Sequence, residues 1–354
     1  MHMADALLSP TVGCTMWAAS AGTIAYCSKK VRQEMDDRKV PLMGVLGAFI
    51  FAAQMINFTI PATGSSGHLG GGLLLAILLG PYAAFLTIAS VLLIQAMFFA
   101  DGGLLALGCN IFNLGVFPAF IAYPLIYKPI VGKRPTQGKI LAASITAAVL
   151  GLQLGAFSVV LETVASGVSS LPFTSFVSLM QPIHLAIGIV EGLVTATVVS
   201  FVYKARPEIL QSAMLAQPLG NISIRTIAIV FLASALLIGG GISRFASEHP
   251  DGLEWSIKKV TGREELEGGK GGLHGMLAAL QEKTAFLPDY SFKKPEVIKS
   301  ETPQPTAGIK NEPSGKPGPE QKKNPGTGIS GILGGLLTLL LIGIIGFVLK
   351  KRIG

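Results

Sequence analysis

Long apolar segments separated by short polar connections constrain this chain more than any other feature of its sequence. Half of its 354 residues are hydrophobic and only 14% are charged, and its mean hydropathy is +0.58. A bilayer is crossed by helices of about 20 apolar residues, so this composition is typical of an integral membrane protein. We therefore predict an all-α membrane protein with about nine transmembrane helices. The apolar segments lie near residues 9–28, 41–60, 69–80, 82–99, 104–127, 139–163, 182–203, 226–243 and 328–349.

The third apolar segment, 69–80, is too short to span a bilayer as a straight helix. It follows a glycine-rich loop, so we expect a short or partly re-entrant helix there. Such backbone is stable at membrane depth only where protein or a cavity satisfies its polar groups.

Lys and Arg residues are unevenly distributed among the short connections between the predicted helices. The short connections 61–68, 100–103 and 164–181 contain none. Cytoplasmic loops carry an excess of positive charge, so the alternation predicts an amino terminus outside the cell and a carboxyl terminus in the cytoplasm. The basic stretches are 29–39, 128–139, 204–225 and the tail after residue 349.

The long connection 244–327 differs in composition from the rest of the chain. Its charges are mixed, and it becomes rich in Pro, Lys, Glu and Gly towards its end. We interpret 298–325 as a disordered linker. The chain then divides into a seven-helix bundle, 1–220, and a two-helix module, 221–354, whose helices near 226–243 and 328–349 are joined by a long extracytoplasmic loop.

The chain begins Met1-His2, at the end that the charge pattern places outside the cell. A free amine, the next amide nitrogen and the imidazole Nδ1 of His2 can chelate one metal ion in a plane, which suits Ni(II) or Cu(II). No Lys or Arg precedes Lys29, so a signal peptide is not expected and Met1 should keep its amine. Alternatively, the histidine carries no function.

A second histidine, His68, lies in the glycine-rich loop on the same predicted face. Glycine allows unusual backbone angles and close approach, so this loop could bring an imidazole to the open corner of the chelate. The predicted site then has four nitrogen donors: the Met1 amine, the His2 amide, the His2 Nδ1 and a His68 ring nitrogen. Alternatively, His68 caps the next helix.

Four further ionisable residues lie in or beside the predicted spans. His184 and Glu191 are seven residues apart, hence on one helix face, and are either partners of the metal ligands or a structural pair. Asp101 either caps the following helix or lies beside the metal ligands. Asp5 either orients a ligand or caps the first helix.

The sequence also argues against several classes of function. No Gly-Lys dipeptide completes the phosphate-binding loop of an ATPase, and no set of catalytic Ser, His and Asp residues or Cys-x-x-Cys pair indicates an enzyme. The net charge of +8 lies largely in the loops, so a nucleic-acid partner is not predicted. The expected surroundings are a lipid bilayer.

Several motifs in order resemble the NikM/CbiM proteins, the substrate-capturing subunits of energy-coupling-factor nickel and cobalt importers. Residues 245–256, which include the run from Pro250 to Trp255, and residues 288–292 resemble the small NikN/CbiN accessory subunit. The motifs that carry the first resemblance are Met1-His2-Met3-Ala4-Asp5, Gly64-Ser65-Ser66-Gly67-His68-Leu69, Asp101-Gly102-Gly103 through Asn110, and His184 through Leu193.

The resemblance implies a metal site at the amino terminus, formed by Met1, His2 and His68. Ser66 departs from the expected loop motif, and Ser65 and Ser66 are candidate neighbours of the ligands. The implied partners are a transmembrane coupling subunit and cytoplasmic ATP-binding-cassette ATPases, in a bacterial or archaeal cell membrane. The small-residue pairs Ala18/Gly22 and Ala21/Ala25 either dock the coupling subunit or, as we expect, pack within the chain.

We therefore expect a protein that captures Ni(II) outside the cell for an ATP-driven importer. Nickel is preferred to Co(II) because a planar nitrogen set with a deprotonated amide suits a low-spin d⁸ ion. One alternative is a stand-alone secondary permease in which His184 and Glu191 couple transport to ions. Another is a membrane metal sensor or scaffold.

Overall fold

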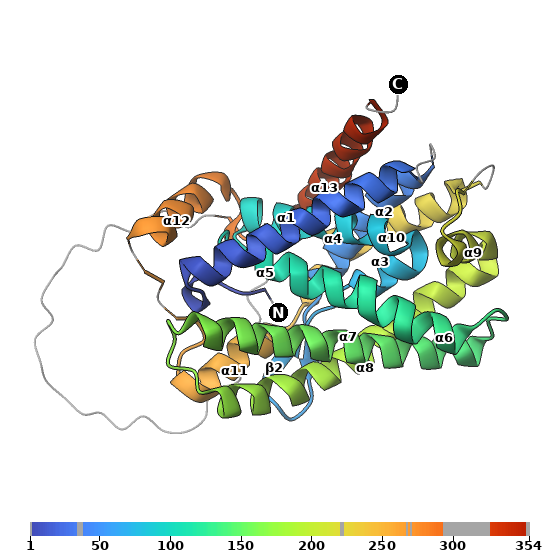
Figure 1. Ribbon diagram of the computed structural model, residues 1–354. Helices are drawn as coiled ribbons and strands as arrows, with labels where there is room; N and C mark the ends of the chain where they lie inside the picture. Colours follow the sequence, from blue (N-terminus) through green and yellow to red (C-terminus); the bar gives the residue numbers. More distant parts are fainter. Residues whose placement is uncertain are drawn as a thin grey trace, which may run out of the picture.

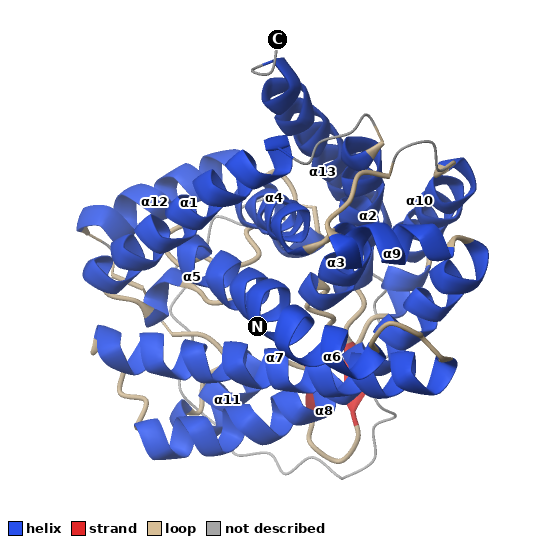
Figure 2. Cartoon of the chain, turned by 45° about the vertical axis from the view of Figure 1, so that its right-hand side comes forward, coloured by secondary structure: helices blue, strands red, loops and turns tan. Residues whose placement is uncertain are grey.

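The computed structural model describes residues 2–33, 38–219, 223–266, 268–269, 271–292 and 326–351. Helices make up most of this part of the chain (Figure 2). Two short strands, β1 (Phe58–Ile60) and β2 (Ser65–Gly67), form an antiparallel hairpin in which Phe58 pairs with Gly67.

Six helices of the described chain are long and apolar enough to cross a membrane. The protein is therefore a multi-pass membrane protein, as predicted, whereas nine crossings and the orientation stay predictions. The six are α4 (Pro81–Phe99), the continuous helix Leu107–Val131, α7 (Gln137–Ser166), α8 (Phe173–Ala205), Arg225–Phe245 and α13 (Gly326–Lys351). Leu107–Val131 consists of α5 (Leu107–Ile111), the π-type helix η2 (Phe112–Tyr127) and α6 (Lys128–Val131), and Arg225–Phe245 consists of α10 (Arg225–Gly240) and the 3₁₀ turn η3 (Ile242–Phe245).

Three further helices complete the bundle. They are α1 (Pro10–Gln33), the apolar 16-residue helix α2 (Lys39–Gln54) and α3 (Gly72–Leu79). The short helix predicted at 69–80 is α3, and every residue of it is buried. Gly71 and Gly80 bound it with φ of +78° and +79°, a backbone conformation that favours glycine.

Two predicted boundaries were wrong. The segment 41–60 was expected to be one helix, but the helix ends at Gln54 and residues 58–60 pair with β2 instead. Helix α8 begins at Phe173 rather than near 182, because Phe176 and Met180 are buried and extend its apolar face by two turns. Pro182 lies inside this helix without ending it.

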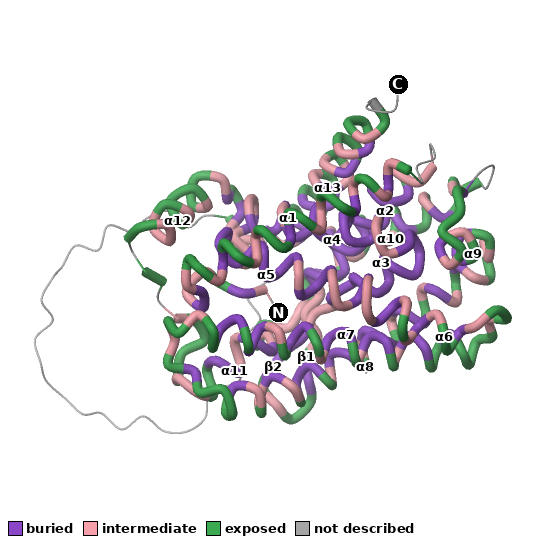
Figure 3. The backbone as a smooth tube through the Cα atoms, in the orientation of Figure 1, coloured by how far each residue is buried: buried purple, intermediate pink, exposed green. Residues whose placement is uncertain are grey.

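The buried helices α3 and α4 lie in the centre of the molecule, with α7 and α8 side by side on one flank and α1 on another (Figures 1 and 3). Helices α10 and α13 pack against each other and against α2. A Cβ on Gly331 would lie 2.3 Å from the Gly239 carbonyl oxygen, so the two helices touch through glycine.

Short elements cover the two ends of the bundle. The segment interpreted as a disordered linker, 298–325, lies outside the described residues. Helix α11 contacts α8, and α12 contacts α4. The short elements at the ends of the bundle are η1 (Asp5–Leu7), α9 (Pro207–Leu215), α11 (Gly252–Thr261), α12 (Gly272–Thr284) and η4 (Pro288–Tyr290).

Candidate metal site

The amino-terminal segment is inserted into the bundle and held there by its backbone. The Met3 amide donates to the Asn110 side-chain oxygen at 2.8 Å, and Gly103 N donates to the Met3 carbonyl at 2.9 Å. Met3 is completely buried. This anchoring fixes the backbone of the residue that follows His2.

His2 contacts a carboxylate at the end of α4. Its Nδ1 lies 2.9 Å from Asp101 Oδ1, and the Tyr290 hydroxyl donates to the other carboxylate oxygen. Asp101 does not cap α5, which begins without a side-chain cap; its two oxygens face His2 and Tyr290 instead. Burial raises the pKa of Asp101, but the neighbouring His2 and the hydrogen bonds from His2 and Tyr290 outweigh it and hold the pKa well below its usual range.

His68 follows β2, and the hairpin brings it against His2. The two imidazole rings stack with centroids 4.9 Å apart and planes 16° apart. His68 Nε2 lies 3.8 Å from Asp251 Oδ2, at the start of α11. The structure thus brings together the two histidines that the sequence predicted as ligands, and each has a carboxylate beside it.

Ser65 and Ser66 bind the C-terminal module. Ser66 N donates to the Pro250 carbonyl at 2.8 Å, and Ser66 Oγ donates to the His249 carbonyl at 2.7 Å. Ser65 Oγ lies 3.3 Å from the Pro250 carbonyl oxygen. Both hydroxyls are thus engaged with the backbone just before Asp251.

Glu191 supports the glycine-rich loop that carries His68. Its two carboxylate oxygens accept hydrogen bonds from Gly70 N at 2.8 Å and Gly71 N at 3.0 Å. His184, also buried on α8, donates from Nδ1 to the Met180 carbonyl at 2.8 Å and lines a small cavity with His68 and Asp251. The hydrogen bonds given for the two side chains thus go to backbone groups.

Asp5 stabilises the turn that precedes α5. Its Oδ1 accepts a hydrogen bond from Ala106 N at 2.9 Å. A Cβ on Gly103 would lie 1.8 Å from the same oxygen, so the turn needs glycine there. Asp5 therefore anchors the amino-terminal segment from one side, as Asn110 does from the other.

A cavity of about 230 Å³ adjoins the two histidines. Four carboxyl groups line it, and a cluster of this kind attracts cations. Burial lowers the pKa of His68 despite its hydrogen bond to Asp251, so the imidazole stays neutral, as a metal ligand must. The acidic residues that line the cavity are Asp101, Asp251, Glu254 and Asp289.

Met1, the third predicted ligand residue, lies outside the described residues. Among the residues that the structure describes, no three or more His, Cys, Asp or Glu side chains are grouped so as to hold a metal ion. The predicted donor set does not require such a group, since two of its four nitrogens belong to the amine and backbone of the first two residues.

Sequence reasoning missed the roles of Asp251, Tyr290 and Asn110. The carboxylate of Asp251 is held by a capping box: Oδ1 accepts from Leu253 N and Glu254 N, while Glu254 accepts from Asp251 N. The pattern Asp251-x-x-Glu254 is a visible capping signal. This capping signal does not indicate that the helix start meets the loop of Ser66, which is 183 residues from His249.

Comparisons with known proteins agree with this architecture. Residues 2–209 match the family described as the cobalt uptake substrate-specific transmembrane region, CbiM, and residues 225–351 match the PDGLE domain. The fused nickel transport protein NikMN of Rhodobacter capsulatus is 30% identical over 319 residues, which cover 82% of this chain and 88% of that protein. A putative fused NikMN of Archaeoglobus fulgidus is 35% identical over 236 residues, covering 67% and 76%.

A solved structure supports the same assignment. The crystal structure of a truncated transition metal transporter superposes with a TM-score of 0.51 at 32% identity, covering 58% of this chain and 99% of that one. The membrane bundle that carries His2 and His68 therefore has a transporter fold. The chain belongs to the NikM/CbiM family of metal transport proteins and carries a fused NikN-like PDGLE module at its C-terminal end.

Proposed function

We propose that this protein captures Ni(II) on the outer face of the membrane, as the substrate-specific subunit of an ATP-driven energy-coupling-factor importer. The observation that carries the proposal is the stacked pair His2 and His68 beside the acidic cavity. Two relatives whose names mark them as fused proteins are named as nickel transport proteins. Cobalt is the alternative cargo, since another relative, of Sorangium cellulosum, is named a cobalt transport protein.

The proposed donors are the Met1 amine, the His2 amide nitrogen, the His2 Nδ1 and a His68 ring nitrogen. A planar set of four nitrogens favours Ni(II) over Co(II). Because His2 Nδ1 contacts Asp101 at 2.9 Å, the incoming cation must replace this contact. The carboxylate then remains beside the ion, where its negative charge favours the bound state.

We further propose that separate subunits supply ATP hydrolysis and membrane coupling. The sequence contains no ATP-binding loop of the Gly-x-x-x-x-Gly-Lys-Ser/Thr type. On α1, the small residues Ala18, Ala21, Gly22 and Ala25 are exposed instead of packing within the chain as we expected. An exposed face of small residues in a membrane helix permits close approach of a helix from another subunit.

Extending the amino terminus by one residue tests the metal site. The added residue moves the amine away from His2, so nickel affinity should fall at least 100-fold, as it should for His2→Ala and His68→Ala. His249→Ala is the control, because that side chain is exposed. Calorimetry measures the affinity, and the absorption spectrum reports planar geometry. An unchanged affinity, or an octahedral oxygen-rich spectrum, would refute the four-nitrogen site.

Reconstitution separates the importer from a secondary permease. Vesicles that hold this chain alone should not accumulate nickel under a proton gradient, whereas vesicles with the coupling and ATPase subunits should do so on addition of ATP. Accumulation by the chain alone would favour the permease. In the structure, Glu191 is already engaged by two backbone amides, which supports a structural role instead of ion coupling.

A further inference from the structure

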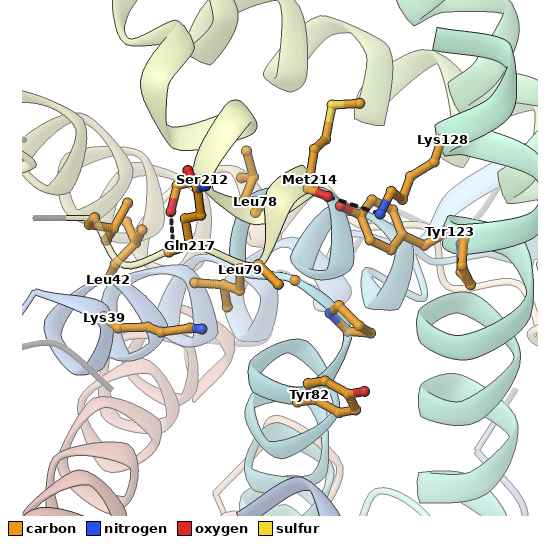
Figure 4. A pocket seen from close by; sticks show the side chains of 16 residues that line it. Lys39, Leu42, Leu78, Leu79, Tyr82, Tyr123, Lys128, Ser212, Met214 and Gln217 are labelled. Atoms are coloured by element: carbon orange, nitrogen blue, oxygen red, sulfur yellow. Dashed lines mark hydrogen bonds between the residues drawn. The ribbon is translucent and has the colours of Figure 1, made fainter. Parts of the chain in front are cut away.

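A basic cavity that shares no lining residue with the cavity beside the two histidines lies between α2, the α3–α4 junction, η2, α6 and α9 (Figure 4). Its volume is about 220 Å³. Both lysines that line it belong to the basic connections predicted to face the cytoplasm. The described residues that line it include no Asp or Glu.

Lys39 and Lys128 enter this cavity from different helices (Figure 4). Lys128 Nζ donates to the Met214 carbonyl at 2.9 Å and lies 5.8 Å from the centre of the Tyr123 ring. An ammonium group has three donors, so this carbonyl uses only one of them. Both lysines thus bring an ammonium group to the cavity wall.

Tyr123 provides a second, independent sign of a missing ligand. Its side chain is 1% exposed and lines the cavity, yet its hydroxyl makes no hydrogen bond to the described part of the protein. A buried hydroxyl without a partner is costly, and most such groups in proteins are paired. An oxygen acceptor in the cavity would satisfy it together with the lysines.

Neighbouring tyrosines and a lysine are of the kind found at the level of lipid headgroups. Tyr82, which lines the cavity, meets Tyr26 of α1 edge to face at 5.7 Å, and Lys30 lies 5.8 Å from the centre of the Tyr26 ring. Tyrosines and lysines of this kind gather where a membrane helix passes from hydrocarbon to headgroups. The cavity is therefore within reach of a lipid in the surrounding bilayer.

An apolar groove begins on α4, one helical turn after Tyr82. Residues 82, 86, 89, 90 and 93 share one face of α4, and all but the first line the groove. Its volume is about 180 Å³ and its surface is almost wholly apolar. The other walls are Trp17 and Ile24 of α1, Ile111 of α5, and Leu341 and Ile345 of α13.

We propose that the cavity and the groove together bind one anionic phospholipid. The phosphate lies among Lys39, Lys128 and the Tyr123 hydroxyl, and one acyl chain lies along α4. Charge complementarity selects an anionic headgroup over a zwitterionic one, as basic pockets between membrane helices on the cytoplasmic side do. The lipid joins α9 to the bundle, since α9 contributes Ser212, Ala213 and Met214 to the cavity wall.

The double variant Lys39→Gln/Lys128→Gln tests the headgroup site. Each basic residue near an anionic lipid contributes roughly fivefold in affinity, so the double variant should bind phosphatidylglycerol roughly 25-fold more weakly. Native mass spectrometry of the full chain, purified with phosphatidylglycerol or phosphatidylcholine, measures the bound lipid. Lys133→Gln/Lys204→Gln is the matched control, because both lysines are exposed in the basic connections and neither lines the cavity.

Ala89→Phe tests the acyl groove, because the added ring fills it. It should reduce lipid retention, while unchanged nickel affinity shows that the chain is folded. Equal lipid retention in the double variant and its control would overturn the proposal. The proposal would also be overturned if inorganic phosphate competed for the site as strongly as the lipid does. It would likewise be overturned if the cavity cross-linked to a co-expressed protein while no lipid was retained.

Discussion

At the residue scale, Asp101 joins the two parts of the chain, because one oxygen contacts His2 and the other accepts from Tyr290. We predict that Asp101→Asn weakens nickel binding about 10-fold to 100-fold, as loss of a carboxylate beside a metal ligand commonly does. Asp289→Asn is the matched control. Asp289 lines the same cavity, and in the part of the chain that the structure describes it makes no ion pair with His2. An equal loss of nickel affinity in both variants would show that the negative charge of the whole cavity matters, and not the contact between Asp101 and His2.

His68 sets an expectation for the pH dependence of binding. Burial lowers its pKa below the ordinary value of about 6.5, so the imidazole is already neutral at pH 7 and releases few protons. The amine and the amide must still deprotonate, so nickel binding at pH 7 should release protons and weaken as the pH falls. Calorimetry in buffers of different ionisation enthalpy counts them. A release near zero would contradict a deprotonated amide.

The same shift predicts how stability depends on pH. The folded state keeps His68 neutral while the unfolded chain binds a proton near pH 6.5, so the unfolded state gains protons first as the pH falls. The contribution of His68 to stability is therefore present above about pH 6.5 and is lost below it. His68→Ala should flatten this part of the stability profile of the metal-free protein, as measured by thermal unfolding.

At the scale of elements, the turn between α4 and α5 seats the amino terminus. Gly102 has φ of +81°, and a Cβ there would lie 2.9 Å from Asn110 Nδ2 and 3.3 Å from the His2 Cβ. We predict that Gly102→Ala lowers the free energy of unfolding by about 1–2 kcal/mol and nickel affinity tenfold or more. Gly167→Ala is the control, because Gly167 has φ of +62° with no atom within 4 Å. Gly167→Ala should lower the free energy of unfolding, as measured by thermal unfolding, because of its positive φ, but it should leave nickel affinity unchanged.

Helices were easier to predict from the sequence than the hairpin beside His68. Long apolar runs predict α4, α7 and α13 because burial in a bilayer demands about 20 apolar residues. The three-residue strands β1 and β2 have no such signal. They depend on pairing with each other and on the Pro250 carbonyl far along the chain. The two histidines were predicted as a pair, but their carboxylate neighbours depend on such long-range contacts.

At the scale of the whole molecule, the C-terminal module closes over the amino-terminal site from two directions. Asp251 reaches His68, and Tyr290 reaches Asp101. Helices α10 and α13 attach the module to α2. The module therefore contributes side chains around the cavity as well as helices in the membrane. The predicted boundary between the bundle, 1–220, and the module, 221–354, does not by itself indicate this contribution.

The described residues on either side of 293–325 lie close together, which predicts that this segment can be shortened. Ser330 Oγ donates to the Tyr290 carbonyl at 3.0 Å, and a Cβ on Gly326 would lie 3.0 Å from the Ser291 Cα. Replacing 296–322 with four Gly and Ser residues shortens the connection roughly threefold, which lowers its closure cost by about 1 kcal/mol. Membrane insertion, thermal stability and nickel affinity should therefore be kept.

A deletion of equal length placed upstream provides the control for this prediction. Removing 288–314 with the same linker also removes Tyr290 and its hydrogen bond to Asp101, so nickel affinity should fall. Calorimetry on both purified proteins distinguishes the effect of length from that of the lost contact. Contacts between η4 and α13 already hold together the elements that the segment connects. Loss of nickel affinity in the 296–322 replacement would therefore assign the segment itself a part in metal capture.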